Sequence, residues 1–433
     1  MKKFILVFLF FSIMLQVGAQ YQIVSSGPFA TLTRLAAVPL VFVWFVDRIS
    51  RKRLRVPNSV LIACFFYIGW TFLSILWCPD PNFGIGYVVY TLSGLALGWI
   101  AWDQCRDNRS LRIISHALIA ACWLLFLVSL KNAIMGNNMY TDRVAASTFD
   151  PNEVSFFMAL VMPIAWFLAT SKEPYNKFLR FLNFIFPGIV FITNLLTASR
   201  GGLLAFLTGA ICISFMIPRT WKTVEFRKPI IQAFSLAIAC VAIILAKAHI
   251  AFQVQRLLAI GSSGSTDQFT GRLPVWKAVL QIIHGHSLLG AGAAGVSYFD
   301  TNAPVPHVMG NEGIIAHNTP LDVAGNYGLI GLALFCAIFY FLIRNAMKKE
   351  INTLHMAISF TAIFAVGAFA ISIESRPQLW VILNICAAIV CGWVTVVVPN
   401  VAAESRRRRL TTDRLVPAYQ AMLPHTTDPA ASK

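Results

Sequence analysis

The sequence predicts an all-α, polytopic membrane protein with about twelve transmembrane helices. Of its 433 residues, 57% are hydrophobic and 12% are charged, whereas about 25% of the residues in soluble domains are charged. The apolar residues form runs close to the about 20 residues that a helix needs to cross a bilayer. Lys and Arg gather in every second connection between these runs. A soluble globular fold is therefore excluded.

The apolar runs place the predicted spans along the chain. We expect spans at 4–19, 30–47, 58–77, 84–102, 112–134, 154–170, 181–198, 202–218, 230–247, 321–343, 355–373 and 378–398. The stretch 181–217 has to hold two spans, because one helix of that length would extend about 55 Å against a hydrocarbon core of about 30 Å. Ser199-Arg200-Gly201-Gly202 is the predicted turn between them, with Ser199 as the cap of the second helix.

The basic residues orient these spans. With a cytoplasmic N-terminus, 26 of the 35 Lys and Arg residues fall in inner connections or in the tail, and nine fall on the outer side. This asymmetry follows the positive-inside rule, so the net charge of +17 reflects topology rather than nucleic-acid binding. Residues 1–19 also resemble a signal peptide. We expect them to be kept as the first span, and the other orientations hold in either case.

Three regions are predicted: a transmembrane bundle at 1–398, an outer loop at 248–320 within it, and a basic, largely disordered cytoplasmic tail at 399–433. The nine cysteines lie mostly in apolar runs without a CxxC motif. They are therefore interpreted as core residues rather than as disulfides or metal ligands.

The outer loop contains one predicted helix. Its apolar positions at helical spacing are Trp276, Val279, Leu280 and Ile283. This pattern predicts an amphipathic helix that lies against the membrane or the bundle. The stretches GSSGST at 261–266 and GAGAAG at 290–295 are predicted to be flexible.

Three predicted helices begin with polar residues on the outer side. The three starts read Asp150-Pro151-Asn152-Glu153, Ser199-Arg200-Gly201-Gly202 and His317-Asn318-Thr319-Pro320. Asp150 and Thr319 are the expected caps of the first and third, and Glu153 occupies the N3 position of the first. Because helix N-termini carry partial positive charge and free N–H groups, they suit anions.

Arginines accompany these helix starts. Arg200 and Arg272 lie on the outer side, and Arg143, Arg256 and Arg376 are further candidates. Arginine binds phosphate with two parallel hydrogen bonds, so the outer face predicts a site for a phosphate-bearing ligand. His284-Gly285-His286 lacks further ligands for a metal and is interpreted as a helix end. We therefore expect neither a metal ion nor a cofactor.

Several segments resemble the O-antigen ligase and O-antigen polymerase family. They are TASRGGLLAFLTG, GRLPVWKAVL with GAGAAG, HNTPLDVAGNYGLIGLALF and RVAASTFDPNEVSFFMAL. The resemblance implies a GT-C-like glycosyltransferase of the bacterial inner membrane with a periplasmic active site. Its donor would be a glycan on undecaprenyl pyrophosphate, and a ligase would use lipid A–core as the acceptor. Many relatives carry an acidic residue where this chain reads Gly325-Asn326-Tyr327-Gly328, which leaves the acceptor type open.

The same resemblance implies roles for single residues. His317 corresponds to the catalytic histidine, and Arg200 and Arg272 correspond to the two arginines that bind pyrophosphate. Asn318, Asp150, Asn152, Arg143 and Arg376 are possible supporting residues. His317 would act as general base, the arginines would stabilise the leaving pyrophosphate, and direct displacement would invert the anomeric configuration.

Three alternatives to a ligase remain. A polymerase would share the donor chemistry and differ in its acceptor. A transporter would place charges and broken helices near the bilayer midplane and often carry internal repeats, whereas the polar motifs here gather at one face. A non-catalytic scaffold of envelope assembly is the third alternative.

Overall fold

The structure is a computed structural model that describes residues 2–18, 32–51, 55–136, 144, 146, 149–171, 175–215, 272–299 and 315–391. Within these ranges the fold is helical and contains no β-strand. The helices are α1 (Lys2–Ile13), α2 (Leu32–Arg51), α3 (Ser59–Leu73), α4 (Pro81–Gln104), α5 (Asn108–Met135), α6 (Pro151–Ala169), α7 (Lys177–Thr197), α8 (Arg200–Ser214), α12 (Arg272–Gly285), α13 (Gly295–Phe299), α14 (Thr319–Ala346), α15 (Ile351–Ala368) and α16 (Pro377–Cys391). A π-helical turn (Met14–Gly18) follows α1, and a 3-10 turn (Ser74–Trp77) follows α3.

Seven of the described helices are long and apolar enough to cross a membrane: α3 with its 3-10 turn, α4, α5, α6, α7, α14 and α15. Helices α8 and α16 are shorter apolar helices. The chain is therefore a helical membrane protein, as predicted. Every predicted span except 230–247 overlaps a described helix, although 202–218 and 378–398 also extend beyond the described residues. Residues 230–247 lie outside the described ranges, as do 261–266 and 399–433, so the total of twelve spans stays a prediction.

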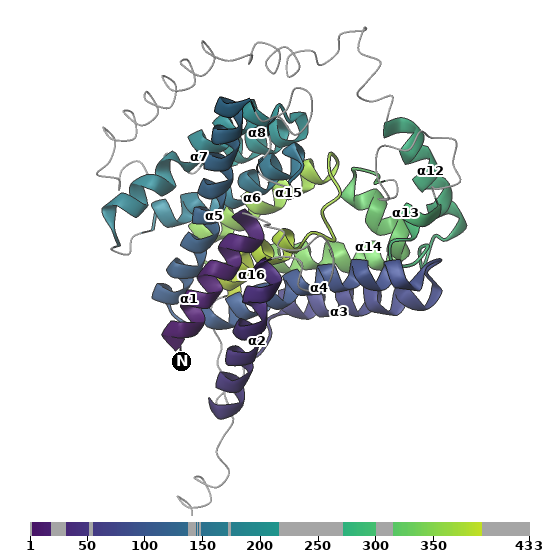
Figure 1. Cartoon of the computed structure of the whole chain (residues 1–433), viewed down its shortest axis with the longest axis horizontal. Coiled ribbons are helices and arrows are strands. Elements are labelled where there is room, and N and C mark those ends of the chain that lie inside the picture. The colour runs from purple at the N-terminus through teal and green to yellow at the C-terminus, as the bar shows by residue number, and fades with distance from the viewer. Residues whose placement is uncertain are drawn as a thin grey trace, which may run out of the picture. The chain divides into compact units, whose positions relative to one another are not determined.

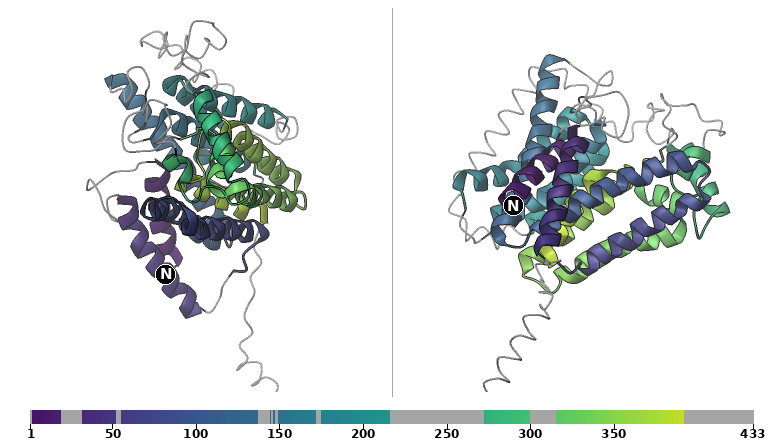
Figure 2. Two further views of the ribbon diagram at one scale, coloured as in Figure 1. Left: turned by 90° about the vertical axis from the view of Figure 1, so that its right-hand side faces the viewer. Right: turned by 60° about the horizontal axis from the view of Figure 1, so that its bottom comes forward.

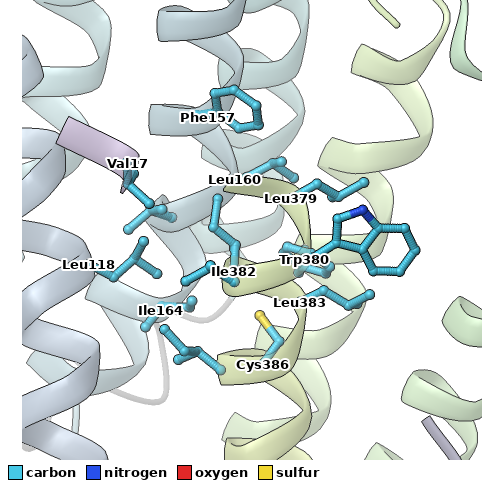
Figure 3. Packing of buried hydrophobic residues seen from close by; sticks show 14 of the residues in the cluster. Val17, Leu118, Phe157, Leu160, Ile164, Leu379, Trp380, Ile382, Leu383 and Cys386 are labelled. Carbon is cyan, nitrogen blue, oxygen red and sulfur yellow. The ribbon is translucent and has the colours of Figure 1, made fainter. Parts of the chain in front are cut away.

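Helix α16 lies at the centre of the bundle, between α5 and α6 on one side and α3, α4 and α14 on the other (Figure 1). Its residues from Pro377 to Val390 are all buried. A helix that is apolar on every face is stable where neighbours cover it completely. Figure 3 shows Trp380, Leu383 and Cys386 of α16 within this core, with Leu118 of α5 and Leu160 of α6 among its other residues.

Two glycines bring α4 close to α16. A Cβ atom added to Gly94 would lie 2.3 Å from the Cα of Pro377, and one added to Gly98 would lie 2.7 Å from the carbonyl oxygen of Trp380. The two glycines are four residues apart and share one face of α4. Such small-residue pairs let two membrane helices approach until their backbones touch, and the position of α16 against α4 depends on them.

The other helices form two groups around α16. Helices α6, α7, α8 and α15 pack together on one side, and α3 packs along α14 on the other (Figure 2). Helices α12 and α13 pack against α14, near one end of the α3–α14 pair (Figure 1). At the N-terminus, Ile5, Leu9 and Ile13 of α1 are fully buried, and α1 packs along α5.

The predicted amphipathic helix is present as α12 and lies against α14 and α13. Its Val275 and Val279 are buried with Val296 and Ala316 in a small separate core, and Trp276 and Ile283 pack at the edge of that core. Leu280 does not face it, because its side chain is 53% exposed. The buried stripe is thus rotated slightly from the predicted one.

The GAGAAG stretch is ordered rather than flexible, which corrects the prediction. Helix α14 is broken at Gly328, where φ is 68° and ψ is −172°. The carbonyl groups that the break leaves without helical partners accept hydrogen bonds from the GAGAAG stretch. Ala291 N–H donates to Gly325 O at 2.8 Å, and Gly292 N–H donates to Asn326 O at 2.9 Å. A Cβ on Gly328 would lie 2.1 Å from Leu288 O. Glycines occur here because two backbones touch, and not because the segment moves.

Of the described residues, 46–51 and 55–56 belong to a small unit that is separate from the unit formed by the other described residues. The described part of the small unit contains an ion pair between Asp47 and Arg48 at 3.2 Å.

Candidate functional site

The segment between α15 and α16, residues 369–376, is the centre of the candidate site and is called the α15–α16 loop here. It contacts the starts of α6, α8, α12 and α14, and also α4. These helix starts carry most of the polar residues that the sequence singled out. The loop itself contributes backbone carbonyl groups, Ser372, Glu374 and Arg376.

Arg200 is the first residue of α8, and the start of α8 is fixed to α6. Ser199 caps α8 as predicted, because its hydroxyl accepts a hydrogen bond from Gly202 N–H at 3.0 Å. The same hydroxyl donates to Asn152 Oδ1 at 2.9 Å, so one side chain joins two helix starts. Gly201 brings the loop near, since a Cβ on it would lie 2.5 Å from the Cβ of Ala370.

Helix α6 begins as the sequence predicts. Asp150 caps it by accepting the N–H of Asn152 at 2.7 Å, and Pro151 opens the first turn. Glu153 at N3 is 6% exposed and pairs with the α15–α16 loop, its Oε1 lying 2.7 Å from Nη2 of Arg376. Arg376 therefore already has a carboxylate partner.

Arg272 is the first residue of α12 and also reaches the α15–α16 loop. Its Nη1 donates to Ala370 O at 3.3 Å. Burial lowers the pKa of the Arg272 guanidinium, and the nearby Asp150 carboxylate opposes that shift. A guanidinium stays charged in proteins despite such a shift. The contact places α12 beside the residues that adjoin Gly201 of α8, although Arg272 and Arg200 are far apart in the sequence.

His317 stands immediately before α14 in a constrained conformation. Its φ is 49°, in the left-handed region, which a non-glycine residue adopts where its surroundings hold it. On one side, Trp276 Nε1–H donates to Ala316 O at 2.8 Å. On the other, Asn318 N–H donates to Ser372 Oγ at 3.1 Å. The backbone around His317 is therefore fixed by α12 and by the α15–α16 loop.

The cap of α14 is Asn318, not Thr319, which corrects the prediction. The Asn318 side chain accepts the N–H of Leu321 at 3.1 Å. Thr319 Oγ1 instead donates to Ile371 O at 2.6 Å and accepts the N–H of Ile373 at 3.2 Å. Because the Thr319 hydroxyl bonds to the α15–α16 loop, the preceding residue, Asn318, caps the helix instead.

Two buried acids beneath the site were missed by the sequence reasoning. Asp322 accepts hydrogen bonds from Ser372 Oγ and from Ala316 N–H. Glu374 accepts one from the Tyr87 hydroxyl of α4, and burial raises the pKa of the Glu374 carboxyl. A signal existed, since each is a single acid within an otherwise apolar stretch, and such residues in membrane proteins are expected to be functional.

The candidate residues thus meet at one place with few exceptions. The elements that carry Arg200, Arg272 and His317 contact residues 370–372. Around them, Asp150 caps α6, Asn152 accepts a hydrogen bond from Ser199, Asn318 donates to Ser372, and Arg376 pairs with Glu153. Arg143 and Arg256 lie outside the described residues. His284 is in the last turn of α12 and His286 follows it, as expected for a helix end. Within the described ranges no group of three His, Cys, Asp or Glu could hold a metal ion.

A comparison with known families gives this geometry a context. Residues 185–336 match the family model described as O-antigen ligase. The match covers about a third of the chain and includes Arg200, Arg272, His317 and Asn318. It confirms the resemblance noted in the sequence. No curated protein matches the chain. Members of this family are membrane enzymes that transfer glycans as ligases or polymerases, and a helical membrane protein fits that class.

Proposed function

We propose that the protein is an O-antigen ligase-type glycosyltransferase of the bacterial inner membrane. It would move a polysaccharide from undecaprenyl pyrophosphate to lipid A–core at the periplasmic face, with both chain termini in the cytoplasm. The single observation that carries this proposal is the convergence of the starts of α8, α12 and α14 on residues 370–372. Arg200 and Arg272 are the first residues of two of these helices and His317 precedes the third, and all three lie within the segment that matches the family.

Arg200 and Arg272 are proposed to bind the pyrophosphate of the donor. Both are the first residues of their helices, where the partial positive charge of the helix adds to that of the guanidinium. Donors that are already oriented stabilise a developing charge without reorganisation. We propose that the arginines do this without a metal ion. The nearby carboxylates of Asp322, Glu374 and Glu153 already accept hydrogen bonds or pair with arginine.

His317 is proposed to act as general base. The acceptor hydroxyl would pass its proton to His317 while its oxygen attacks the anomeric carbon of the donor. The bond from that carbon to the pyrophosphate oxygen would break, and undecaprenyl pyrophosphate would leave as an anion. Attack opposite the leaving group inverts the anomeric configuration. The hydrogen bonds on both sides of His317 support this role, because a base has to be held in position.

The test is the lipopolysaccharide banding of a deletion strain complemented with the wild type, with His317→Ala or with His284→Ala. His284 is the matched control, since it is an exposed histidine outside the α15–α16 loop. A ligase predicts that deletion leaves long polymer on undecaprenyl pyrophosphate that never reaches lipid A–core. The His317→Ala variant should then fail to restore ligation, and His284→Ala should restore it.

Three other results would lead to different conclusions. Loss of the polymer itself, with single repeat units still reaching the core, would identify a polymerase, which the family match equally allows. Full restoration by His317→Ala would remove the general-base role. A transporter would leave unmodified donor on the cytoplasmic side, and this outcome would contradict an enzyme of either type.

A further inference from the structure

A cavity of about 740 Å³ lies between α1, α5 and α7, away from the α15–α16 loop. Its walls are apolar along most of their length, with Phe10, Trp123 and Leu179 among the lining residues. At one end the lining changes to Arg109 and Arg112 of α5. Fourteen residues of helix separate Arg109 from Trp123, which is about 21 Å, compared with about 15 Å for half of the hydrocarbon core.

The basic end continues into a second cavity of about 540 Å³ that shares Phe10, Arg109 and Ile113 with the first. Lys2 and Lys3 also line this second cavity. The one acid in the two linings, Asp107, is paired with Lys2 at 2.5 Å. The cavities therefore carry a net positive charge at one end and an apolar channel at the other.

The polar side of the first cavity is a built arrangement. Asn183 is 1% exposed, and its Nδ2 donates to His116 Nε2 at 3.1 Å and to the Tyr175 hydroxyl at 3.2 Å. His116 Nδ1 in turn bonds to Arg112 O at 2.7 Å. The Oδ1 of Asn183 is buried and has no hydrogen-bond partner among the residues that the structure describes. A buried amide oxygen without a partner is costly, and a ligand group with a hydroxyl would satisfy it.

We propose that this cavity binds one anionic glycerophospholipid of the bilayer. Its phosphate contacts Arg109 and Arg112, a headgroup or glycerol hydroxyl reaches the polar side at Asn183, and one acyl chain lies along Phe10, Leu179 and Trp123. Basic pockets between transmembrane helices bind anionic headgroups in this way, and the guanidinium matches a phosphate in geometry.

The position of the cavity separates it from the glycan site. Helix α6 begins after its cap Asp150 at the candidate site and ends at Ala169, and its 19 residues span about 28 Å. At this far end of α6, the Tyr175 hydroxyl donates to Leu168 O at 2.8 Å. Arg112 lies at the same end, because its guanidinium is 6.0 Å from the centre of the Tyr175 ring. The cavity thus opens at the opposite end of the bundle. The positive-inside rule accounts for basic residues at that end, but not for an apolar channel leading from them.

The proposal is tested on the purified full-length protein by native mass spectrometry after delipidation. The protein is titrated with phosphatidylglycerol, with phosphatidylcholine of the same acyl chains, and with inorganic phosphate. We expect one phosphatidylglycerol to bind at least about tenfold more tightly than phosphatidylcholine. The Arg109→Gln, Arg112→Gln double variant should lose that preference. The matched control Lys348→Gln should keep it, because Lys348 is an exposed basic residue at the end of α14 and lines neither cavity.

A second variant tests the same cavity without removing charge, in case the double arginine variant does not fold. Ala120 lines the cavity, and Ala120→Phe fills the channel without changing charge, so it should weaken phosphatidylglycerol binding while thermal unfolding stays near that of the wild type. Equal binding of the two lipids would overturn the proposal. It would also fail if inorganic phosphate displaced the lipid, or if a polyprenyl phosphate competed with it for the cavity. None of these readouts depends on the glycan transfer reaction.

Discussion

Arg376 and Glu153 form an ion pair, with Nη2 and Oε1 2.7 Å apart, that ties the α15–α16 loop to the start of α6. Glu153 is nearly buried, and Arg376 is about one-third exposed. The pair lies next to Asp150, the cap of α6, and it completes the set of contacts by which one loop holds four helix starts. Its energetic role can be measured apart from catalysis.

The variants Glu153→Gln and Arg376→Gln should each lower the thermal stability of the protein in detergent. Removing one partner leaves the other charge poorly compensated, so the double variant should be less destabilised than the sum of the single ones. We expect a coupling free energy of about 1–3 kcal/mol in the cycle. Strict additivity would show that the two residues do not interact.

Replacing Arg200 or Arg272 by lysine should lower glycan transfer by about 10- to 100-fold while the protein still folds. Lysine keeps the charge but loses the planar pair of donors that matches a phosphate. The measurement is transfer from a purified lipid-linked donor. Lys277→Ala serves as the control, since Lys277 is an exposed cation on the same helix as Arg272. A loss in that variant as large as in the lysine variants would argue against phosphate binding by α12.

Glu374 makes stability depend on pH. Burial raises the pKa of its carboxyl, so the native state prefers the protonated form. The stabilisation of the native state by the protonated carboxyl is fully present below the ordinary glutamate pKa of about 4.3. It is lost as pH rises through the raised pKa of the folded state. Glu374→Gln mimics the protonated form and can still accept the Tyr87 hydroxyl. The melting temperature of this variant should rise relative to that of the wild type as the pH increases from about 5 to about 8, because only the wild type loses this contribution. A difference in melting temperature that narrows with rising pH would contradict this assignment.

Gly98→Leu should strongly destabilise the bundle. Even a Cβ at this position would lie 2.7 Å from the carbonyl oxygen of Trp380, and a backbone group cannot move aside as a side chain can. Overpacking of this kind costs about 1–3 kcal/mol or more. Gly86→Leu on the same helix is the control, because a Cβ there meets nothing within 4 Å. Thermal unfolding in detergent measures both, and equal melting temperatures would refute close α4–α16 packing.

Helix positions and caps were largely predictable because their signals are local. The length of an apolar run and a Ser or Asp before it depend on neighbouring residues, and α8 with its Ser199 cap agrees with the prediction. The cap of α14 was not predictable. The choice between Asn318 and Thr319 depended on Ile371, which is distant in the sequence and offers its carbonyl to the threonine.

The break of α14 at Gly328 was unpredictable for the same reason. Glycines at 290–295 suggested flexibility, but their use became clear only from the carbonyl groups of Gly325 and Asn326 that they approach. The place of Asp322 and Glu374 in the site likewise became clear only from their hydrogen bonds to Ser372 and Tyr87, which lie on other elements.

The sequence by itself determined that this protein is helical and lies in a membrane, because composition and the length of apolar runs decide which environment a chain can enter. It also placed Arg200 and His317 in the motifs that open two helices, whereas only the structure made Arg272 the first residue of α12. The tertiary structure alone decided that these starts meet at residues 370–372, since that meeting depends on how α15 and α16 pack among the other helices. Close packing between elements is set by shape and by backbone contact at glycines, which no local pattern of residues specifies.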